Sequence, residues 1–194
     1  MKVIGMTGGV GSGKSTVCQV MKEQFHAAII YTDEVARNLM KKGEVSYNLV
    51  LSHYGADILA EDGEIDRPKL AQILFSDETE RERINSFSHP YVKEYVLNKI
   101  AEYKQAGEVD YIVVETALPY EACLTEFCDD IIYVTVSDEV RTQRLMESRG
   151  YSEEKVRNML KSQLSEEAFK AVCTKVLKND KGIEAIKEQL QEIL

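Results

Sequence analysis

Short runs of apolar residues alternate with amphipathic stretches along much of the chain. Two of these runs, Val109–Glu115 and Asp130–Val136, are rich in β-branched residues. Such runs are typical of strands that are buried on both faces of a parallel sheet. The same pattern predicts shorter strands at Lys2–Thr7 and Ala27–Tyr31, and a short last strand at Lys175–Lys178.

Helical patterns follow most of the predicted strands. Amphipathic spacing predicts helices over about Ser15–Phe25, from Asp33 to about Met40, and over Asp138–Arg149. A further helix is expected to open at Ser152, and a closing helix is expected at Gly182–Leu194. Because strands and helices alternate in this order, we expect a parallel sheet between two layers of helices, which is a three-layer α/β fold.

The stretch 45–105 interrupts this alternation, because its patterns are helical throughout and contain no run that reads as a buried strand. Turn-forming and helix-breaking residues are expected to interrupt its helices at Gly55, Asp62, Gly63, Pro68 and Pro90. We therefore interpret the chain as a single domain. Its core would comprise residues 1–44, 106–137 and 172–194, with a helical insert at 45–105 and a small helical lid at 138–171.

A glycine-rich segment joins the first predicted strand to the first predicted helix. Residues 7–16 read T-G-G-V-G-S-G-K-S-T, and they contain the pattern G-x-x-x-x-G-K-[ST]. Glycines let the backbone fold around phosphates with its N–H groups pointing inward, and the helix that follows presents its positive N-terminus. We predict an ATP site formed by Gly9, Val10, Gly11, Ser12, Gly13, Lys14, Ser15 and Thr16.

Two side chains of this segment have distinct predicted roles. Lys14 would place its cation against the β- and γ-phosphates, and the Ser15 hydroxyl is the expected ligand of the Mg²⁺ that accompanies ATP. With an apolar strand before it and a helix after it, the segment indicates a P-loop nucleoside-triphosphate hydrolase fold. Such a site alone names neither a reaction nor a substrate.

Composition and missing motifs narrow the function further. The chain of 194 residues has 24 Lys and Arg against 33 Asp and Glu, a net charge of −9. This balance disfavours nucleic acid as a partner, because phosphate backbones attract a surplus of positive charge. The guanine-reading segment N-K-x-D of GTPases is missing from the sequence, and a large ATPase motor needs a longer chain. A small-molecule kinase is favoured; a non-catalytic ATP-binding module is the alternative from another class.

Polar residues follow two of the predicted strands. The carboxyl ends of parallel strands border the crevice in which such folds bind ligands. Asp33 would therefore either accept the proton of an attacking hydroxyl or only cap the following helix. One turn later, Arg37 would either reach an anionic acceptor or remain a solvated surface residue. Glu115 would either lie near the metal or be a simple loop acid.

Three arginines lie on or just after the helix predicted at 138–149. They are Arg141, Arg144 and Arg149. A kinase must exclude water from the phosphoryl group in transfer, and closing helices that carry arginines onto the phosphates meet this need. A solvated helix face is the alternative interpretation of the same spacing.

With these residues in view, the sequence resembles the dephospho-CoA kinase family over nearly its whole length. Its phosphate loop is very close to that family's version, and Tyr31–Arg37 is similar to the family's acidic segment followed by Ala-Arg. Further matches are Tyr54, Gly55, Asp62, Gly63, Arg67, Leu70, His89 and Pro90 in the insert, Glu115–Glu121 at a strand end, Gln143–Met146, Gly150–Ser152, Arg157 and Gln163 in the lid region, and Asn179 with Gly182 near the last strand.

The resemblance implies transfer of the γ-phosphoryl group of ATP to the 3′-hydroxyl of the dephospho-CoA ribose, the last step of coenzyme A synthesis. It implies Asp33 as the base and the helical insert as the acceptor-binding part, with Arg37 and His89 near the acceptor. A nucleoside or nucleoside-monophosphate kinase, which shares the loop and an insert, is the rival within enzymes.

On the nucleotide side, the resemblance implies that Lys14 and Arg144 act in catalysis by offsetting charge on the transferred group. Arg141 would contact ATP as well, and Asn179 would lie near the adenine.

Three segments depart from the family's pattern. The segment after Glu115 reads Ala-Leu-Pro where Pro-Leu-Leu is usual, and Cys173-Thr174 replaces Ala-Asp before the last strand. In the lid, Ser148 stands where the second arginine is expected, and the arginine follows at Arg149. These changes bear on the lid and the adenine pocket more than on the reaction.

The cysteines and apolar runs bear on the compartment. The spacing of Cys18, Cys123, Cys128 and Cys173 fits neither C-x-x-C nor a paired metal pattern, and we expect small core residues in a reducing compartment. No apolar run approaches the roughly 20 residues needed to span a bilayer. We therefore expect a cytoplasmic protein, a monomer or weak oligomer, that acts without a membrane.

Overall fold

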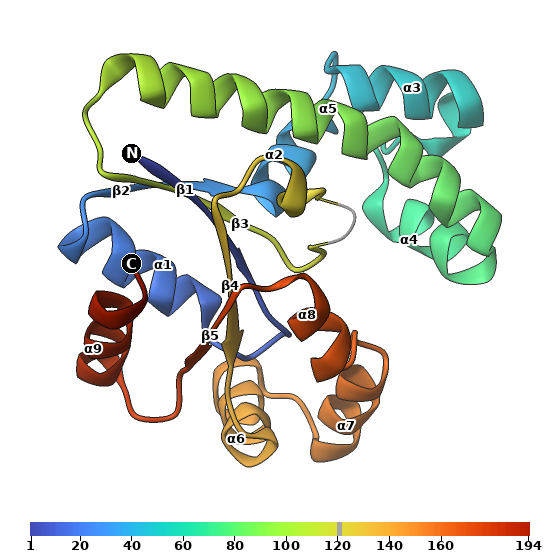
Figure 1. Ribbon diagram of the computed structural model, residues 1–194. Coiled ribbons are helices and arrows are strands. Elements are labelled where there is room, and N and C mark those ends of the chain that lie inside the picture. Colours follow the sequence, from blue (N-terminus) through green and yellow to red (C-terminus); the bar gives the residue numbers. More distant parts are fainter. Residues whose placement is uncertain (120–121) are drawn as a thin grey trace. The chain divides into compact units, whose positions relative to one another are not determined.

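The computed structural model describes residues 1–119 and 122–194, which form two compact units (Figure 1). The first unit comprises Met1–Ile30 and Ile100–Leu194, and the second comprises Tyr31–Lys99. The helical insert expected at 45–105 falls mostly in the second unit, and its bounds as a functional part stay a prediction. Tyr120 and Glu121, the end of the family-like segment after Glu115, lie outside the described residues.

A five-stranded sheet with the order β2-β3-β1-β4-β5 forms the centre of the first unit. Its strands are β1 (Lys2–Thr7), β2 (Ala27–Tyr31), β3 (Tyr111–Glu115), β4 (Asp130–Thr135) and β5 (Lys175–Lys178). β1 pairs in parallel with β3 and β4, and β4 pairs in parallel with β5. All five strands coincide with the apolar runs. β1, β3 and β4 contain continuous runs of buried residues, as strands covered on both faces do, whereas β5 is buried only at Leu177.

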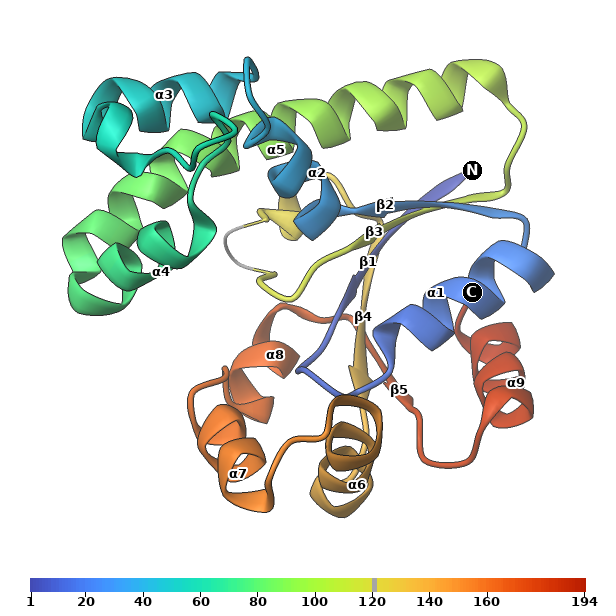
Figure 2. The same cartoon turned by 180° about the vertical axis from the view of Figure 1, so that it is seen from behind.

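Helices cover both faces of this sheet. The helices of the first unit are α1 (Lys14–Gln24), α6 (Asp138–Arg149), α7 (Glu153–Lys161), α8 (Glu166–Val172) and α9 (Ile183–Ile193), together with the 3₁₀ turn η2 (Leu124–Glu126). α1 and α9 lie side by side on one face, and α8 lies on the other (Figures 1 and 2). There the ring of Phe169 stacks on Tyr133 of β4, with centroids 5.0 Å apart. The three-layer α/β fold is confirmed.

The second unit is helical around a core of its own. Its elements are α2 (Thr32–Leu39), α3 (Val45–Tyr54), the 3₁₀ turn η1 (Ala56–Ile58), α4 (Arg67–Ser76) and most of α5 (Glu78–Ala106). The core includes Tyr47, Val50, Ile58, Leu70 and Ile84. Strand pairing within the described part of this unit is limited to an isolated bridge between Leu59 and Ile65, so the expectation of a helical stretch is confirmed.

One expected break in the helices is wrong. Pro90 lies inside α5, which runs without interruption from Glu78 to Ala106. A proline within a helix costs about 3 kcal/mol through its missing N–H and its ring. Ile84 and Val92, buried on either side of it, anchor both turns to the core and offset that cost. Gly55, by contrast, ends α3 with a φ of 72°.

Within residues 1–119 and 122–194, no helix combines the length and the apolar character that a membrane crossing requires.

Replacing Leu177 by Ala should destabilise the first unit by about 2–5 kcal/mol, because Leu177 is fully buried in β5 and its removal leaves a cavity. Val176, its neighbour on the same strand, is 40% exposed, and Val176→Ala serves as the matched control, with an expected loss near 0.5 kcal/mol. Urea denaturation followed by circular dichroism measures both. Equal losses in the two variants would contradict the described burial of β5.

Candidate active site

The phosphate loop lies between β1 and α1, as its sequence predicts. Gly13 is the N-cap of α1 with a φ of 84°, and its carbonyl accepts hydrogen bonds from the N–H groups of Thr16 and Val17. A Cβ atom at Gly13 would lie 2.1 Å from Asn179 Nδ2. Only glycine fits both the left-handed backbone and this close approach. Ser15 and Thr16 are exposed in the first turn of α1.

Lys14 folds back across the loop. Its Nζ donates a hydrogen bond of 2.7 Å to the carbonyl of Gly8 and lies 3.6 Å from Oε1 of Glu115. The side chains of Lys14 and Glu115 are only 12% and 13% exposed. Glu115 ends β3 directly beside β1, where it pairs in register with Met6. Glu115 thus lies at the phosphate loop, and its place near the metal stays a prediction.

Asn179 ties the loop to the end of β5. It is 3% exposed, and its Nδ2 donates a 2.9 Å hydrogen bond to the carbonyl of Ser12. The backbone carbonyl of Asn179 accepts a hydrogen bond of 2.8 Å from Nη2 of Arg144. Arg144 therefore lies at the loop, and Asn179 supports the loop's backbone. The place of Asn179 near the adenine stays a prediction.

Arg141 lies over the glycines of the loop. A Cβ atom at Gly9 would lie 3.2 Å from Arg141 Nη1, and one at Gly11 would lie 2.9 Å from Arg141 Cγ. The Nε atom of Arg141 is buried without a hydrogen-bond partner in the described part of the chain. Arg149, in contrast, is exposed at the end of α6, with its guanidinium 6.0 Å from the centroid of the Tyr151 ring. Two of the three arginines are thus brought to the loop.

Gln163 is a loop contact that the sequence analysis did not select. It follows α7, and its Oε1 accepts a hydrogen bond of 3.1 Å from the N–H of Val10. A Cβ atom at Gly9 would lie 2.4 Å from the same oxygen. Its place in the family-like lid pattern was the available signal, but a glutamine carries no charge to mark it as a phosphate-site residue.

Cys18, in the helix α1 that follows the phosphate loop, is an unreactive thiol. It is fully buried, with its Sγ 3.6 Å from the Sδ of Met6. Burial above all, and then the negative charge of Glu115, raises the pKa of the Cys18 thiol to about 12. A thiol with this pKa stays protonated at neutral pH and is not a nucleophile. Of the four cysteines expected as core residues, Cys18 is buried, whereas Cys123, Cys128 and Cys173 are only half-buried.

A cavity of about 530 Å³ lies within the second unit. Its lining includes Asp33 and Arg37 of α2 together with Ser88. Asp33 is the second residue of α2, whose N-cap is Tyr31, and no side chain caps this helix by a hydrogen bond. The alternative that Asp33 only caps α2 is therefore not supported. His89 is half-buried in α5, next to the lining residue Ser88.

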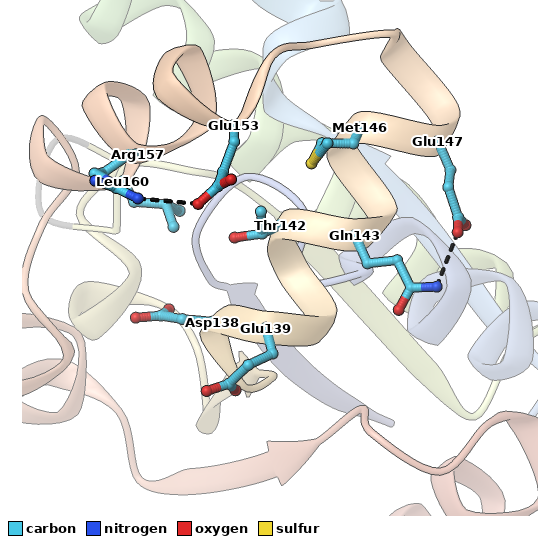
Figure 3. A pocket seen from close by; sticks show the side chains of 9 residues that line it. All are labelled: Asp138, Glu139, Thr142, Gln143, Met146, Glu147, Glu153, Arg157 and Leu160. Atoms are coloured by element: carbon cyan, nitrogen blue, oxygen red, sulfur yellow. Dashed lines mark hydrogen bonds and ion pairs between the residues drawn. The ribbon is translucent and has the colours of Figure 1, made fainter.

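A second cavity, of about 640 Å³, is lined by side chains of α6 and α7 (Figure 3). Its lining contains four carboxylates and one guanidinium, that of Arg157, which is paired with Glu153 at 2.9 Å. Figure 3 also shows Gln143 bonded to Glu147 on the same helix. A lining with this excess of negative charge repels phosphates, so we assign no nucleotide to it.

Comparison with known proteins identifies the family. The family profile described as dephospho-CoA kinase matches residues 2–185. The chain belongs to the dephospho-CoA kinase family. A dephospho-CoA kinase of Bacillus cereus is 37% identical over 192 residues, covering 99% of this chain and 95% of that protein. One of Carboxydothermus hydrogenoformans is 36% identical and covers 100% of this chain and 93% of that protein.

The fold agrees with this membership. The crystal structure of TT1252 from Thermus thermophilus superposes with a TM-score of 0.81 at 24% identity, covering 99% of this chain and 95% of that one. At that identity the likeness concerns the fold alone.

Replacing Lys14 by Ala should weaken ATP binding by at least tenfold, because a charge-assisted hydrogen bond contributes about 1.5–3 kcal/mol. Isothermal titration with ATP and magnesium measures the dissociation constant. Lys22→Ala, an exposed lysine in the last turn of the same helix, is the control and should bind ATP like the wild type. Wild-type affinity for ATP in the Lys14 variant would show that Lys14 does not contribute to phosphate binding.

Proposed function

We propose that this protein transfers the γ-phosphoryl group of ATP to the 3′-hydroxyl of the dephospho-CoA ribose, giving coenzyme A and ADP. The observation that carries the proposal is the phosphate loop with Lys14 folded across it, in a chain that matches the dephospho-CoA kinase profile over residues 2–185. The names of its relatives at 36–37% identity support the same acceptor.

ATP binds on the loop residues Gly9–Thr16 in this proposal. Inward-facing N–H groups and Lys14 hold the β- and γ-phosphates, and Arg141 and Arg144 approach from α6. The buried, unpartnered Nε of Arg141 supports an anion as its partner. The proposed place of Asn179 near the adenine is supported by its contact with the loop at Ser12.

Magnesium fits the chemistry of this site. Ser15 offers an exposed hydroxyl in the first turn of α1, an oxygen ligand of the kind a hard cation prefers. No group of three or more His, Cys, Asp and Glu side chains suited to a metal occurs among residues 1–119 and 122–194. Both facts suit an ion carried mainly by the phosphates of ATP, and the ion would supply neutralisation of the developing charge.

The acceptor hydroxyl is oriented by Asp33. Its carboxylate accepts the hydrogen bond, and then the proton, of the 3′-hydroxyl as the bond to phosphorus forms. Arg37 follows one helical turn later and lines the same cavity, which supports its role in holding an anionic acceptor. His89 is proposed to contact the acceptor from α5. Phosphoryl transfer passes through a loose transition state, so orientation and electrostatics should matter more than the strength of the base.

Arg144 and Lys14 offset the negative charge that spreads over the transferred group. Arg144 is held in reach of the loop by its bond to the carbonyl of Asn179. A fixed cation stabilises charge better than water does, because it needs no reorganisation as the reaction proceeds. The lid that carries Arg141 and Arg144 would also exclude water, which would otherwise compete with the acceptor for the phosphoryl group.

The cysteines bear on the proposed compartment. Burial raises the pKa of the Cys18 and Cys128 thiols to about 12 each and that of Cys173 to about 11. Thiols that stay protonated in this way suit a reducing compartment such as the cytoplasm. We further propose that the protein is a monomer or weak oligomer. It acts on small molecules and not on nucleic acids or membranes.

The variant Asp33→Asn should lower kcat for dephospho-CoA by about 10²–10⁴-fold, because an amide cannot accept the proton of the hydroxyl. The KM for ATP should change by less than about threefold, since the nucleotide is bound by the loop. A coupled assay of ADP release measures both constants, and phosphorus NMR identifies the new phosphomonoester on the ribose.

Asp57→Asn, at an exposed position of η1 in the same unit, is the control and should keep wild-type turnover. A wild-type kcat in the Asp33 variant would exclude Asp33 as the base. If the wild type releases ADP with nucleosides or nucleoside monophosphates but not with dephospho-CoA, the proposed acceptor is wrong.

A further inference from the structure

The carboxyl end of β5 and the residues that follow it contact several elements of the first unit. The Nδ2 of Asn179 donates to the carbonyl of Ser12 in the phosphate loop, and its backbone carbonyl accepts from Arg144 of α6. The next residue, Asp180, accepts at Oδ1 a hydrogen bond of 3.0 Å from the N–H of Ser137, the N-cap of α6. This strand end therefore helps to place both the phosphate loop and the helix that carries the two arginines at the loop.

The same strand end is held from its outer side by a glutamine. β5 lies at the edge of the sheet, and in the described part of the chain it pairs with β4 alone. An edge strand has a row of backbone groups that no strand pairs. At Lys178, however, the Oε1 of Gln189 accepts from the backbone N–H and its Nε2 donates to the backbone carbonyl, both at 2.9 Å. Gln189 thus pairs with the last residue of β5 as a further strand would.

Gln189 is itself held in one orientation. It is half-buried on α9, which lies beside β5 (Figure 2). Its Nε2 also donates at 2.9 Å to the carbonyl of Ala185, one turn earlier on the same helix. Ile186 and Leu190 are fully buried and anchor α9 to the core. Because both the oxygen and the nitrogen of this amide are bonded, Gln189 cannot turn without breaking hydrogen bonds, and it holds Lys178 in a fixed place.

Asn179 and the phosphate loop are in close contact. Asn179 is 3% exposed, and a Cβ atom at Gly13 would lie 2.1 Å from its Nδ2. Because protein interiors are closely packed, a displacement of Asn179 is passed on to the loop and is not absorbed by free space. A displacement of about 1 Å in a reacting site can cost about 10²-fold in rate. Even a smaller shift of the loop and of Arg144 should therefore have a measurable effect on the nucleotide.

We propose that Gln189 is a positioning residue of the phosphate site and acts through Asn179. Lys178 and Asn179 are joined by a planar peptide group, so a shift of one moves the other. By fixing Lys178, Gln189 directs the amide of Asn179 to the phosphate loop and its carbonyl to Arg144. Gln189 touches neither nucleotide nor acceptor, and the proposal rests on the nucleotide site of the proposed function.

Titration calorimetry with ADP and magnesium tests this role without the acceptor. Gln189→Ala should weaken ADP binding about three- to tenfold, because the loop and Arg144 lose part of their preorganisation. Gln189→Leu, which keeps the bulk of the side chain but neither hydrogen bond to Lys178, should show the same loss. Gln191→Ala, an exposed glutamine on the same helix, is the matched control and should bind ADP like the wild type. Thermal unfolding checks that each variant is folded at the temperature of the titration.

A double-mutant cycle tests whether Gln189 acts through Asn179. In the background of Asn179→Ala, the further change Gln189→Ala should alter ADP affinity by less than about twofold, because the intermediary is already lost. A glutamine that only stabilised α9 against β5 would show no such dependence on Asn179. An equal loss of affinity in both backgrounds would therefore contradict the proposed positioning role.

The remaining outcomes separate this inference from the proposed function. Wild-type ADP affinity in both Gln189→Ala and Gln189→Leu would refute the role of Gln189 and leave the proposed function intact. Loss of affinity in Gln189→Ala but not in Gln189→Leu would assign the effect to packing, and it would also refute the role of the hydrogen bonds. A wild type that binds ADP but does not phosphorylate dephospho-CoA would refute the proposed acceptor alone. A wild type that binds no ADP would refute both proposals.

Discussion

The backbone of the phosphate loop is the constraint on which the site depends. Its N–H groups can point inward only if the chain turns through left-handed conformations, as Gly13 does at a φ of 84°. The loop is also fixed from a distance, because Asn179 donates to the carbonyl of Ser12 across 167 residues of sequence. A loop held in this way is shaped for phosphates before they arrive, which lowers the ordering cost of binding.

The charge of the whole protein and the charge of its site have opposite signs. The chain carries a net charge of −9, yet Lys14, Arg141 and Arg144 gather at one loop. Glu115, within 3.6 Å of Lys14, offsets part of this charge while no phosphate is bound. Salt screens exposed charges from one another beyond roughly 8–10 Å at physiological ionic strength, so these neighbours, and not the net charge, govern binding.

Features set by neighbouring residues were the ones that the sequence predicted well. The bounds of α6 at Asp138–Arg149 and of β5 at Lys175–Lys178 are as expected, because periodicity and capping are local. Pro90 and Gln163 were not predicted, since each depends on partners distant in sequence. The helix at Pro90 is stabilised by core packing. Gln163 contacts Val10 of the phosphate loop, 153 positions before it in the sequence. The roles of Asp33 and Arg37 stay predictions.

The short connection between β2 and α2 has a consequence for the proposed acceptor chemistry. α2 begins at Thr32, directly after β2 ends at Tyr31, and buried Thr32 and Val35 anchor its first turn. Asp33 and Arg37 are four residues apart, so they share one face of this helix. A base and an anion-binding cation carried on one anchored turn keep a fixed separation. In the proposed mechanism, an acceptor held by Arg37 would present its hydroxyl to Asp33 at a distance that the helix determines, and binding and orientation would become a single event.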